Sequence, residues 1–312
     1  MLFRSRRARR PRRPLADRVL SGGGAGRGRA SALIDLESAD GAPGVLLGVI
    51  GWPVGHSRSP SMHGAALAAL GLPWRYVRLP IPVELLEETV RALPGSGFRG
   101  ANVTIPHKEA ALRLAGSATP AARAIGAANT LTFTADGVHA DNTDAGGLID
   151  ALELPVGGRR ALVLGAGGAG RAAAWALREA GAEVSVWNRT PARAETVAAD
   201  LGVMHALDVR PALHGVDVMV NATSVGLRST AGGADALEVL GLDGAEPPLV
   251  VVDLVYGAQP TPVERWARAG GARVVDGVEI LVRQGARSLE GWTGRSAPLD
   301  VMRGAVLRRG VG

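Results

Sequence analysis

The sequence contains one lysine, Lys108, in the stretch Asn102-Val-Thr-Ile-Pro-His-Lys. The other 34 of its 35 basic residues are arginines. An arginine stays protonated in proteins, whereas the pKa of a lysine ammonium can be lowered until the group releases a proton. The position of Lys108 therefore predicts a site of proton transfer. A lysine left by chance at a solvated helix start is the competing interpretation.

Two pairs of polar residues stand near the ends of predicted apolar elements. Ser57 and Ser59 lie in a loop after an apolar run, and Ser59 is expected to be the N-cap of a helix with Pro60 at its first position. Hydroxyls beside a helix N-terminus suit a carboxylate, because the free amide N–H groups and the helix dipole also favour an anion. A plain N-cap is the alternative. Asn129 and Asp144 fit a substrate cleft and equally fit surface turns.

A glycine-rich turn stands between an apolar strand and a helix in the second half of the chain. Gly165, Gly167 and Gly170 give the G-x-G-x-x-G spacing. In this context bare backbone lets the pyrophosphate of a dinucleotide approach a helix N-terminus, which predicts a dinucleotide-binding domain. The residues of the turn are Gly165, Ala166, Gly167, Gly168, Ala169 and Gly170.

The residues after the next strand, at 183–187, indicate which dinucleotide binds. NAD proteins usually carry Asp or Glu at this strand end, where a carboxylate accepts a hydrogen bond from the ribose 2′-hydroxyl. This chain has Asn188, Arg189 and Thr190 there, with Arg193 shortly after. Guanidinium groups pair with a 2′-phosphate, so the sequence favours NADP over NAD. Two solvated arginines in an arginine-rich chain are the alternative.

In the first half of the chain, Lys108, Ser57, Ser59 and Asn129 are expected to lie in or next to short strands and helices. A further helix is expected after Gly146 and Gly147. The expected strands are 45–50, 74–79, 100–105 and 125–134, and the expected helices are 59–71, 83–93 and 108–114.

The second half alternates apolar strands with helices, which predicts a parallel α/β sheet. Tyr256 follows the strand 249–255 at its carboxyl end, where ligands bind in such sheets. A long helix from Gly277 carries Gln284, which is expected to face the cleft. A last helix at 296–309 should return to the first domain. The other expected strands are 160–164, 183–187, 216–220 and 273–275, and the other expected helices are 171–180 and 261–269.

Taken together, these motifs resemble the shikimate dehydrogenase family, in the same order from about residue 45 to 305. Several independent motifs in one order are more specific than any one of them. The matching stretches are Gly51-x-Pro53-x-x-His56-Ser57-x-Ser59-Pro60-x-x-His63, Asn102-Val103-Thr104-x-Pro106-His107-Lys108, Gly126-Ala127-x-Asn129-Thr130, Asn142-Thr143-Asp144, the glycine turn, Asn188-Arg189-Thr190, Asn221-Ala222-Thr223-Ser224-x-Gly226, Asp253-x-x-Tyr256, and Asp276-Gly277 with Gln284.

The resemblance implies an α/β fold with a split α/β substrate domain, a Rossmann-like NADP-binding domain and a cleft between them. The implied reaction is the reversible, NADP-dependent reduction of 3-dehydroshikimate to shikimate in aromatic amino-acid biosynthesis. The expected domains are the substrate domain at 45–145, the NADP domain at 146–277, and C-terminal helices at 278–312 that return to the substrate domain. The Arg/Gly-rich residues 1–44 have no counterpart in the family and are expected to be a disordered extension. A nucleic-acid or membrane arm and an Arg-rich transit peptide are the alternatives for this segment.

The resemblance also implies a role for each site residue. Ser57 and Ser59 would hold the substrate carboxylate, and Lys108 with Asp144 would handle the proton on the oxygen that becomes the ketone. The ring hydroxyls would be held by Thr104, Asn129, Asp144 and Gln284. Tyr256 is expected to join the substrate site. The expected cofactor contacts are the glycine turn, Asn188, Arg189, Thr190, Arg193, Thr223, Ser224 and Gly277.

Two positions depart from the family pattern, and other functions remain open at this point. Gly64 stands where the family usually has Asn, and Leu227 where it usually has Met. A quinate/shikimate dehydrogenase or a paralogue acting on an aminated analogue is a close alternative. A non-catalytic NADP-binding sensor is an alternative of another class, but it predicts loss of the Lys108, Asp144 and Asn129 set, which is present.

Composition and charge argue against several other classes of protein. Residues 1–44 hold ten Arg and four acidic residues, whereas residues 45–312 hold 25 basic and 25 acidic residues, so the folded part carries no nucleic-acid signature. There is no Cys, which excludes disulfides and thiolate metal sites and fits a reducing, cytoplasmic setting. The six His form no metal-ligand cluster, and no apolar run is long enough to span a membrane. A homodimer is possible.

Overall fold

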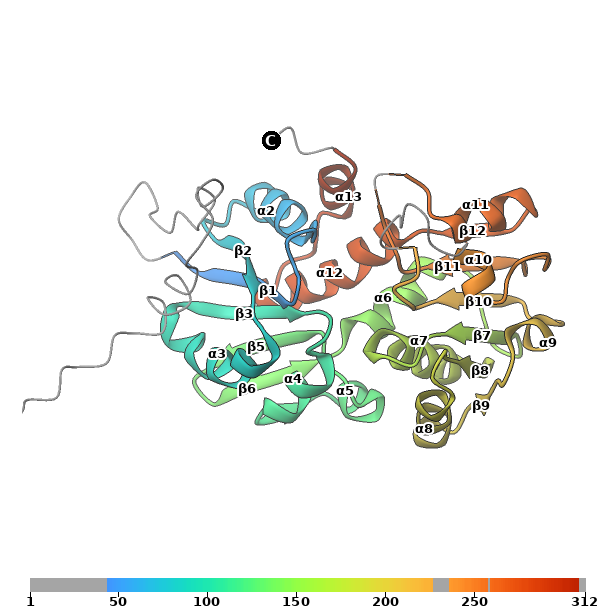
Figure 1. The fold of residues 1–312 in the computed structure, drawn as a ribbon. Coiled ribbons are helices and arrows are strands. Elements are labelled where there is room, and N and C mark those ends of the chain that lie inside the picture. The colour runs from blue at the N-terminus through green and yellow to red at the C-terminus, as the bar shows by residue number, and fades with distance from the viewer. Residues whose placement is uncertain (1–43, 227–235, 258, 309–312) are drawn as a thin grey trace, which may run out of the picture.

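The computed structural model describes residues 44–226, 236–257 and 259–308. Two six-stranded sheets lie side by side, each with helices packed on its faces (Figure 1). The expected extension at 1–44, apart from Gly44, and the position Leu227 lie outside the described residues.

The first sheet is mixed, with the strand order β2-β1-β3-β5-β6-β4. β1 pairs in parallel with β2 and β3, whereas β5 is antiparallel to both β3 and β6. The parallel half directs the carboxyl ends of β1 and β3 toward the second sheet, and this positions the Ser57 and Lys108 loops (Figure 1). The strands are β1 (Leu46–Gly51), β2 (Arg75–Pro80), β3 (Phe98–Val103), β4 (Ser117–Ala118), β5 (Thr130–Thr134) and β6 (Gly137–Asp141).

Two apolar clusters hold helices against this sheet. Leu47 and Val49 of β1 pack with α2 and α12, whereas Ile50 and Val103 pack on the other side, with Leu86 of α3 and Ala111 of α4. The expected helix 83–93 is a 3₁₀ turn followed by an α-helix. The elements are α2 (Ser59–Ala69), the 3₁₀ helices η1 (Val83–Leu85) and η2 (Pro94–Ser96), α3 (Leu86–Ala92), α4 (Lys108–Leu114) and α5 (Pro120–Ile125).

The second sheet is wholly parallel, with the order β12-β11-β10-β7-β8-β9. β10 and β11 are buried at every position, as strands covered on both faces should be. The strands are β7 (Arg160–Leu164), β8 (Glu183–Trp187), β9 (Met204–His205), β10 (Val218–Asn221), β11 (Val250–Asp253) and β12 (Arg273–Val275). The helices are α7 (Gly168–Glu179), α8 (Pro191–Leu201), α9 (Val209–Leu213), α10 (Ala236–Val239) and α11 (Pro262–Ala269).

Two helices connect the two sheets, and a third follows them. α6 (Thr143–Leu152) leads from the first sheet to the second, and α12 (Gly277–Thr293) runs back beside it (Figure 1). The indole N–H of Trp292, near the end of α12, donates to the carbonyl of Leu131 in β5 at 3.1 Å. α13 (Leu299–Leu307) then packs against α2. The fold is therefore α/β, as the sequence predicts, and α12 and α13 pack against elements of the first half of the chain.

Three local predictions were wrong. Residues 125–129 are not strand, because α5 ends at Ile125 and Gly126 adopts the left-handed conformation (φ 76°) that stops it. Gly146 and Gly147 lie inside α6 rather than before it. Ser59 is the first residue of α2 and not its N-cap; that position is Arg58, which makes no side-chain capping bond.

Candidate active site

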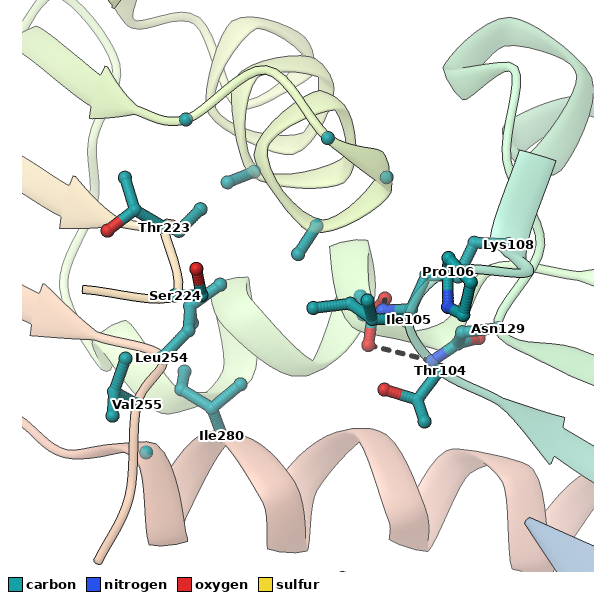
Figure 2. A pocket seen from close by; sticks show the side chains of 18 of the residues that line it. Thr104, Ile105, Pro106, Lys108, Asn129, Thr223, Ser224, Leu254, Val255 and Ile280 are labelled. Carbon is teal, nitrogen blue, oxygen red and sulfur yellow. Dashed lines mark hydrogen bonds and ion pairs between the residues drawn. The ribbon is translucent and has the colours of Figure 1, made fainter. Parts of the chain in front are cut away.

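A cavity of about 630 Å³ lies between the two sheets, where the carboxyl ends of their parallel strands face one another. Lys108 and Asn129 line it from the first sheet, and Thr223 and Ser224 line it from the second (Figure 2). Ile280 of α12 completes the wall between them. Both halves of the chain therefore contribute polar groups to one space.

Lys108 and Asp144 form a close ion pair on the first-sheet side. Lys108 Nζ lies 2.6 Å from Asp144 Oδ2, and the two side chains are 14% and 18% exposed. Lys108 is placed by the start of α4, and Asp144 lies in the first turn of α6, whose N-cap Asn142 accepts from the Ala145 amide. The second carboxylate oxygen accepts from Asn129 Nδ2 at 2.8 Å. Such a pair can pass a proton to or from a bound hydroxyl group.

Asn129 connects this pair to the floor of the cavity. Its amide N–H also lies 3.2 Å from the side-chain oxygen of Gln284 in α12. Its carbonyl oxygen accepts from the Thr143 amide at 2.7 Å, which fixes which way the side chain points. Because Asn129 and Gln284 are buried and hydrogen-bonded, they present fixed polar groups to any ligand.

Ser57, Ser59 and Tyr256 also line the cavity and lie near one another. The Ser59 amide donates to Ser57 Oγ at 3.3 Å, so one serine braces the loop that carries the other. Burial raises the pKa of the Tyr256 phenol, while hydrogen bonds at the Arg58 backbone and the Ser57 side chain lower it. The phenol of Tyr256 is therefore in place beside the serine loop.

The glycine turn fits the pyrophosphate of a dinucleotide. A Cβ on Gly170 would lie 1.9 Å from the Gly165 carbonyl oxygen, so only glycine allows this tight turn. Gly165 itself has a φ of 112°. A Cβ on Gly167 would meet no atom within 4 Å, so its backbone borders open space at the start of α7. Backbone N–H groups at a helix start suit a phosphate group.

Two arginines also line the cavity on the side of the second sheet. Arg189 and Arg193 are exposed at the mouth of the cavity, and neither is paired with a carboxylate among the described residues. Asn188 instead braces the turn, because its side-chain oxygen accepts from the Ala166 amide at 3.2 Å. Thr223 is held by the Asn221 side chain, to which its hydroxyl donates at 2.7 Å.

Three family models match the chain in sequence order. The shikimate dehydrogenase substrate binding domain matches residues 49–131, the shikimate/quinate 5-dehydrogenase model matches residues 151–268, and the shikimate 5′-dehydrogenase C-terminal domain matches residues 277–307. A shikimate dehydrogenase (NADP⁺) of Paracoccus denitrificans is 46% identical over 267 residues, which cover 82% of this chain and 93% of the relative. The chain belongs to the shikimate dehydrogenase family.

Solved structures of this family share the architecture. The shikimate 5-dehydrogenase of Thermus thermophilus, crystallised in complex with NADP(H) and shikimate, is 40% identical with a TM-score of 0.75, and the match covers 84% of this chain and 98% of that one. The shikimate dehydrogenase of Aquifex aeolicus is 33% identical with a TM-score of 0.80, covering 87% of this chain and all (100%) of that one.

The structure brings the predicted site residues of this shikimate dehydrogenase family member into one cavity, with one exception. Gly170 does not line the cavity but packs beneath the turn on Gly165. The predicted residues that line it are Ser57, Ser59, Thr104, Lys108, Asn129, Asp144, Gly165, Ala166, Gly167, Gly168, Ala169, Asn188, Arg189, Thr190, Arg193, Thr223, Ser224, Tyr256, Gly277 and Gln284.

Sequence reasoning missed a buried polar network that reaches the cavity wall at Asn102. The Tyr76 hydroxyl donates to the side-chain oxygen of Asn102 at 2.8 Å, and the Asn102 amide donates to Ser288 at 2.9 Å and to Thr130 at 3.1 Å. Thr130 in turn donates to Asn129 at 3.0 Å. Asn102 could have been found, because it is a polar residue on an apolar strand, at the start of the motif that ends in Lys108. Ser288 gives no signal, since it lies in mid-helix.

Asp253, at the end of β11, holds the loop that carries Tyr256. It is fully buried, and burial raises its pKa to about 6 against the lowering effect of hydrogen bonds from Thr261, Val255 and Asn221. Thr261 also caps α11, so one carboxylate ties the strand end, the loop and the following helix together.

The described ranges contain neither a cluster of metal-ligating side chains nor a helix that could span a membrane. No group of three or more His, Asp or Glu side chains there could hold a metal ion. In the same ranges, no helix has the length and apolar character that crossing a membrane requires.

Proposed function

We propose that this protein catalyses the reversible, NADP-dependent oxidation of shikimate to 3-dehydroshikimate. The observation that carries the proposal is the place of the Lys108–Asp144 pair directly beside the glycine turn. A Cβ on Gly168 would come within 3.0 Å of the Lys108 Cβ, so the lysine stem packs against the turn. A proton-handling pair and a dinucleotide cradle therefore border the same space, as an alcohol dehydrogenase requires.

Two sets of lining side chains support the substrate-binding roles. Ser57, Ser59 and Tyr256 would offer hydroxyl donors to the substrate carboxylate. Asn129 and Gln284 would offer amide groups to the ring hydroxyls, and Thr104 also lines the cavity. This spacing of donors would orient a small, polyhydroxylated ring acid with one carbon toward the cofactor.

The proton follows a path through this chain's own residues. NADP, when bound, would supply the hydride exchange. As the alcohol is oxidised, its proton passes to the Lys108–Asp144 pair and from there to solvent, and the reverse reaction returns it to the carbonyl oxygen. Asn129 holds the carboxylate of the pair in position through its bond to Asp144 Oδ1. Arg189 and Arg193 would pair with the 2′-phosphate.

The two sheets support a division into a substrate domain over 45–145 and a cofactor domain over 146–277, with 278–312 returning to the first. We place the enzyme in the cytoplasm, consistent with its lack of cysteine. A homodimer is compatible with this division and would be detected by light scattering.

The test is an absorbance assay of nicotinamide reduction with shikimate or quinate, each combined with NADP⁺ or NAD⁺. We expect strong reduction of NADP⁺ with shikimate alone. Activity with quinate or NAD⁺ would move the protein to the quinate-oxidising branch. Binding of NADPH without turnover of either acid would contradict the proposal and favour a sensor.

A further inference from the structure

The three residues proposed to bind the substrate carboxylate, Ser57, Ser59 and Tyr256, all offer neutral hydroxyl groups. Hydroxyl groups can bind a carboxylate, but they bind a neutral ester or amide by the same geometry. A site that selects an anion needs a positive field in addition to such donors.

Two arginines flank these hydroxyls. Arg78 of β2 donates from Nη2 and Nε to the Ser57 carbonyl, at 2.7 and 3.2 Å. Arg58 lies between the two serines, and its guanidinium carbon is 5.7 Å from the centre of the Tyr256 ring. It also donates to the carbonyl of Gly257 at 3.0 Å. The positive charges of both arginines act on the Tyr256 phenol and lower its pKa against the larger effect of burial.

Neither arginine is neutralised by a carboxylate in the described part of the chain, where both donate only to backbone carbonyls or face an aromatic ring. Many other arginines behave differently and form ion pairs with Asp or Glu. The paired ones are Arg91, Arg159, Arg171, Arg178, Arg268, Arg273, Arg283, Arg287 and Arg303.

We propose that Arg58 and Arg78 form an uncompensated positive frame around the three hydroxyls, and that their charge makes the site select a carboxylate over a neutral analogue. This inference rests on the proposed function, because it names what recognises the acid group of that substrate. The arginines act from behind the hydroxyls and are specificity-determining, while proton transfer stays with Lys108 and Asp144.

Arg78 is the residue to test, because Arg58 also fastens the Tyr256 loop. Arg78→Met should raise the KM for shikimate about 3- to 10-fold with kcat within about twofold, the size expected for a charge that is partly exposed to solvent. The effect should shrink at high salt, because exposed charges are screened. The inhibition constant of shikimate methyl ester, which carries no charge, should not change.

Two further variants distinguish the effect of the Arg78 charge from the effect of its hydrogen bonds to the Ser57 carbonyl. Arg78→Lys keeps the charge but loses the two-pronged bond to Ser57, so its KM should stay near that of the wild type. Arg91→Met removes a remote charge of the same domain and should leave the KM unchanged. Equal weakening of acid and ester, an Arg78→Lys variant as poor as Arg78→Met, or an unchanged KM in Arg78→Met would overturn the proposal. Failure of the proposed function would look different, since wild type itself would not oxidise shikimate.

Discussion

At the scale of residues, we expect the chemistry to depend on Lys108, because its ammonium group can release a proton, whereas the arginines of the site stay charged. Lys108→Ala should lower kcat by roughly 10²–10⁴-fold, the usual size of a lost general acid–base group, with a smaller change in KM. Steady-state kinetics with shikimate and NADP⁺ measure both constants. Lys108→Arg is the matched control: it keeps a cation beside Asp144 but cannot release a proton, so it should be nearly as slow. A fast Arg variant would mean that charge alone is needed.

We expect the choice between NADP and NAD also to depend on two side chains, those of Arg189 and Arg193. Arg189→Ala should weaken NADP⁺ binding about 10- to 100-fold, because it removes a charge-assisted bond to the 2′-phosphate, and should leave NAD⁺ nearly unaffected. Titration of both dinucleotides by calorimetry gives the two affinities. Arg178→Ala, on the far end of α7, controls for the loss of a surface charge. Equal losses for NADP⁺ and NAD⁺ would assign Arg189 a role other than phosphate recognition.

Site residues that belong to a recognisable sequence motif could be predicted. Residues that act through hydrogen bonds to distant parts of the chain could not. Lys108 is unusual in composition, and the glycine turn has a fixed spacing, so both stood out. Tyr76 and Ser288 contribute through hydrogen bonds to residues that only the fold brings near, 26 positions away for Tyr76 and 186 for the Ser288–Asn102 pair. The proposed role of Arg58 and Arg78 could not be predicted, because single arginines do not stand out in a chain that is rich in arginine.

At the scale of elements, strands with a clear apolar pattern were predicted better than short connections. Arg160–Leu164 and Glu183–Trp187 have the expected bounds. The first carries a continuous apolar run and the second alternates buried residues with partly or fully exposed ones, and both patterns are strong strand signals. The short helix Pro120–Ile125 was missed and its residues were partly assigned to a strand. Six residues give too little periodicity, and the Thr119 cap, which accepts from the Ala122 amide, was overlooked.

Packing of α6 against α12 depends on a glycine at their contact. A Cβ on Gly147 would lie 2.7–2.9 Å from the backbone and Cβ of Gln284, so Gly147→Ala must push the two helices apart. We expect a loss of about 1–3 kcal/mol in the free energy of unfolding, as for other overpacked cores, together with lower activity because Gln284 moves. Urea unfolding and the shikimate assay measure the two effects.

Gly291, on α12, provides the matched control. A Cβ there would meet no atom within 4 Å, so Gly291→Ala should instead raise the free energy of unfolding by about 0.5–1 kcal/mol through the higher helix propensity of alanine. A Gly147→Ala variant as stable as wild type would show that the two helices can separate without cost.

At the scale of the whole molecule, stability depends on buried ionisable groups in both halves. His63, stacked on Tyr76 at 4.2 Å in the first half, has neither ring nitrogen hydrogen-bonded within the described structure, and burial lowers its pKa from 6.5 to about 3. Asp253, in the second half, has its pKa raised by burial from 3.8 to about 6. The two groups have opposite effects on the pH dependence of unfolding.

The signs follow from which state binds the proton. Between pH 6.5 and about 3, unfolded His63 is protonated and folded His63 is not, so its contribution to stability is lost as the pH falls. Between pH 3.8 and about 6, folded Asp253 holds a proton that the unfolded state releases, so its contribution is lost as the pH rises. Each group changes the free energy of unfolding by at most about 1.4 kcal/mol per pH unit, and over pH 4–6 the two effects nearly cancel.

Single variants should therefore break this balance in opposite directions. His63→Phe keeps the stack on Tyr76 and removes the histidine slope, so between pH 6 and 4 its free energy of unfolding should rise relative to wild type as the pH falls. Asp253→Asn removes the other slope, so its free energy of unfolding should fall relative to wild type over the same range. Urea unfolding at a series of pH values gives the differences, whatever constant offset each substitution adds. Parallel curves for His63→Phe and wild type would show that His63 is protonated alike in both states, which complete burial beside Tyr76 does not allow.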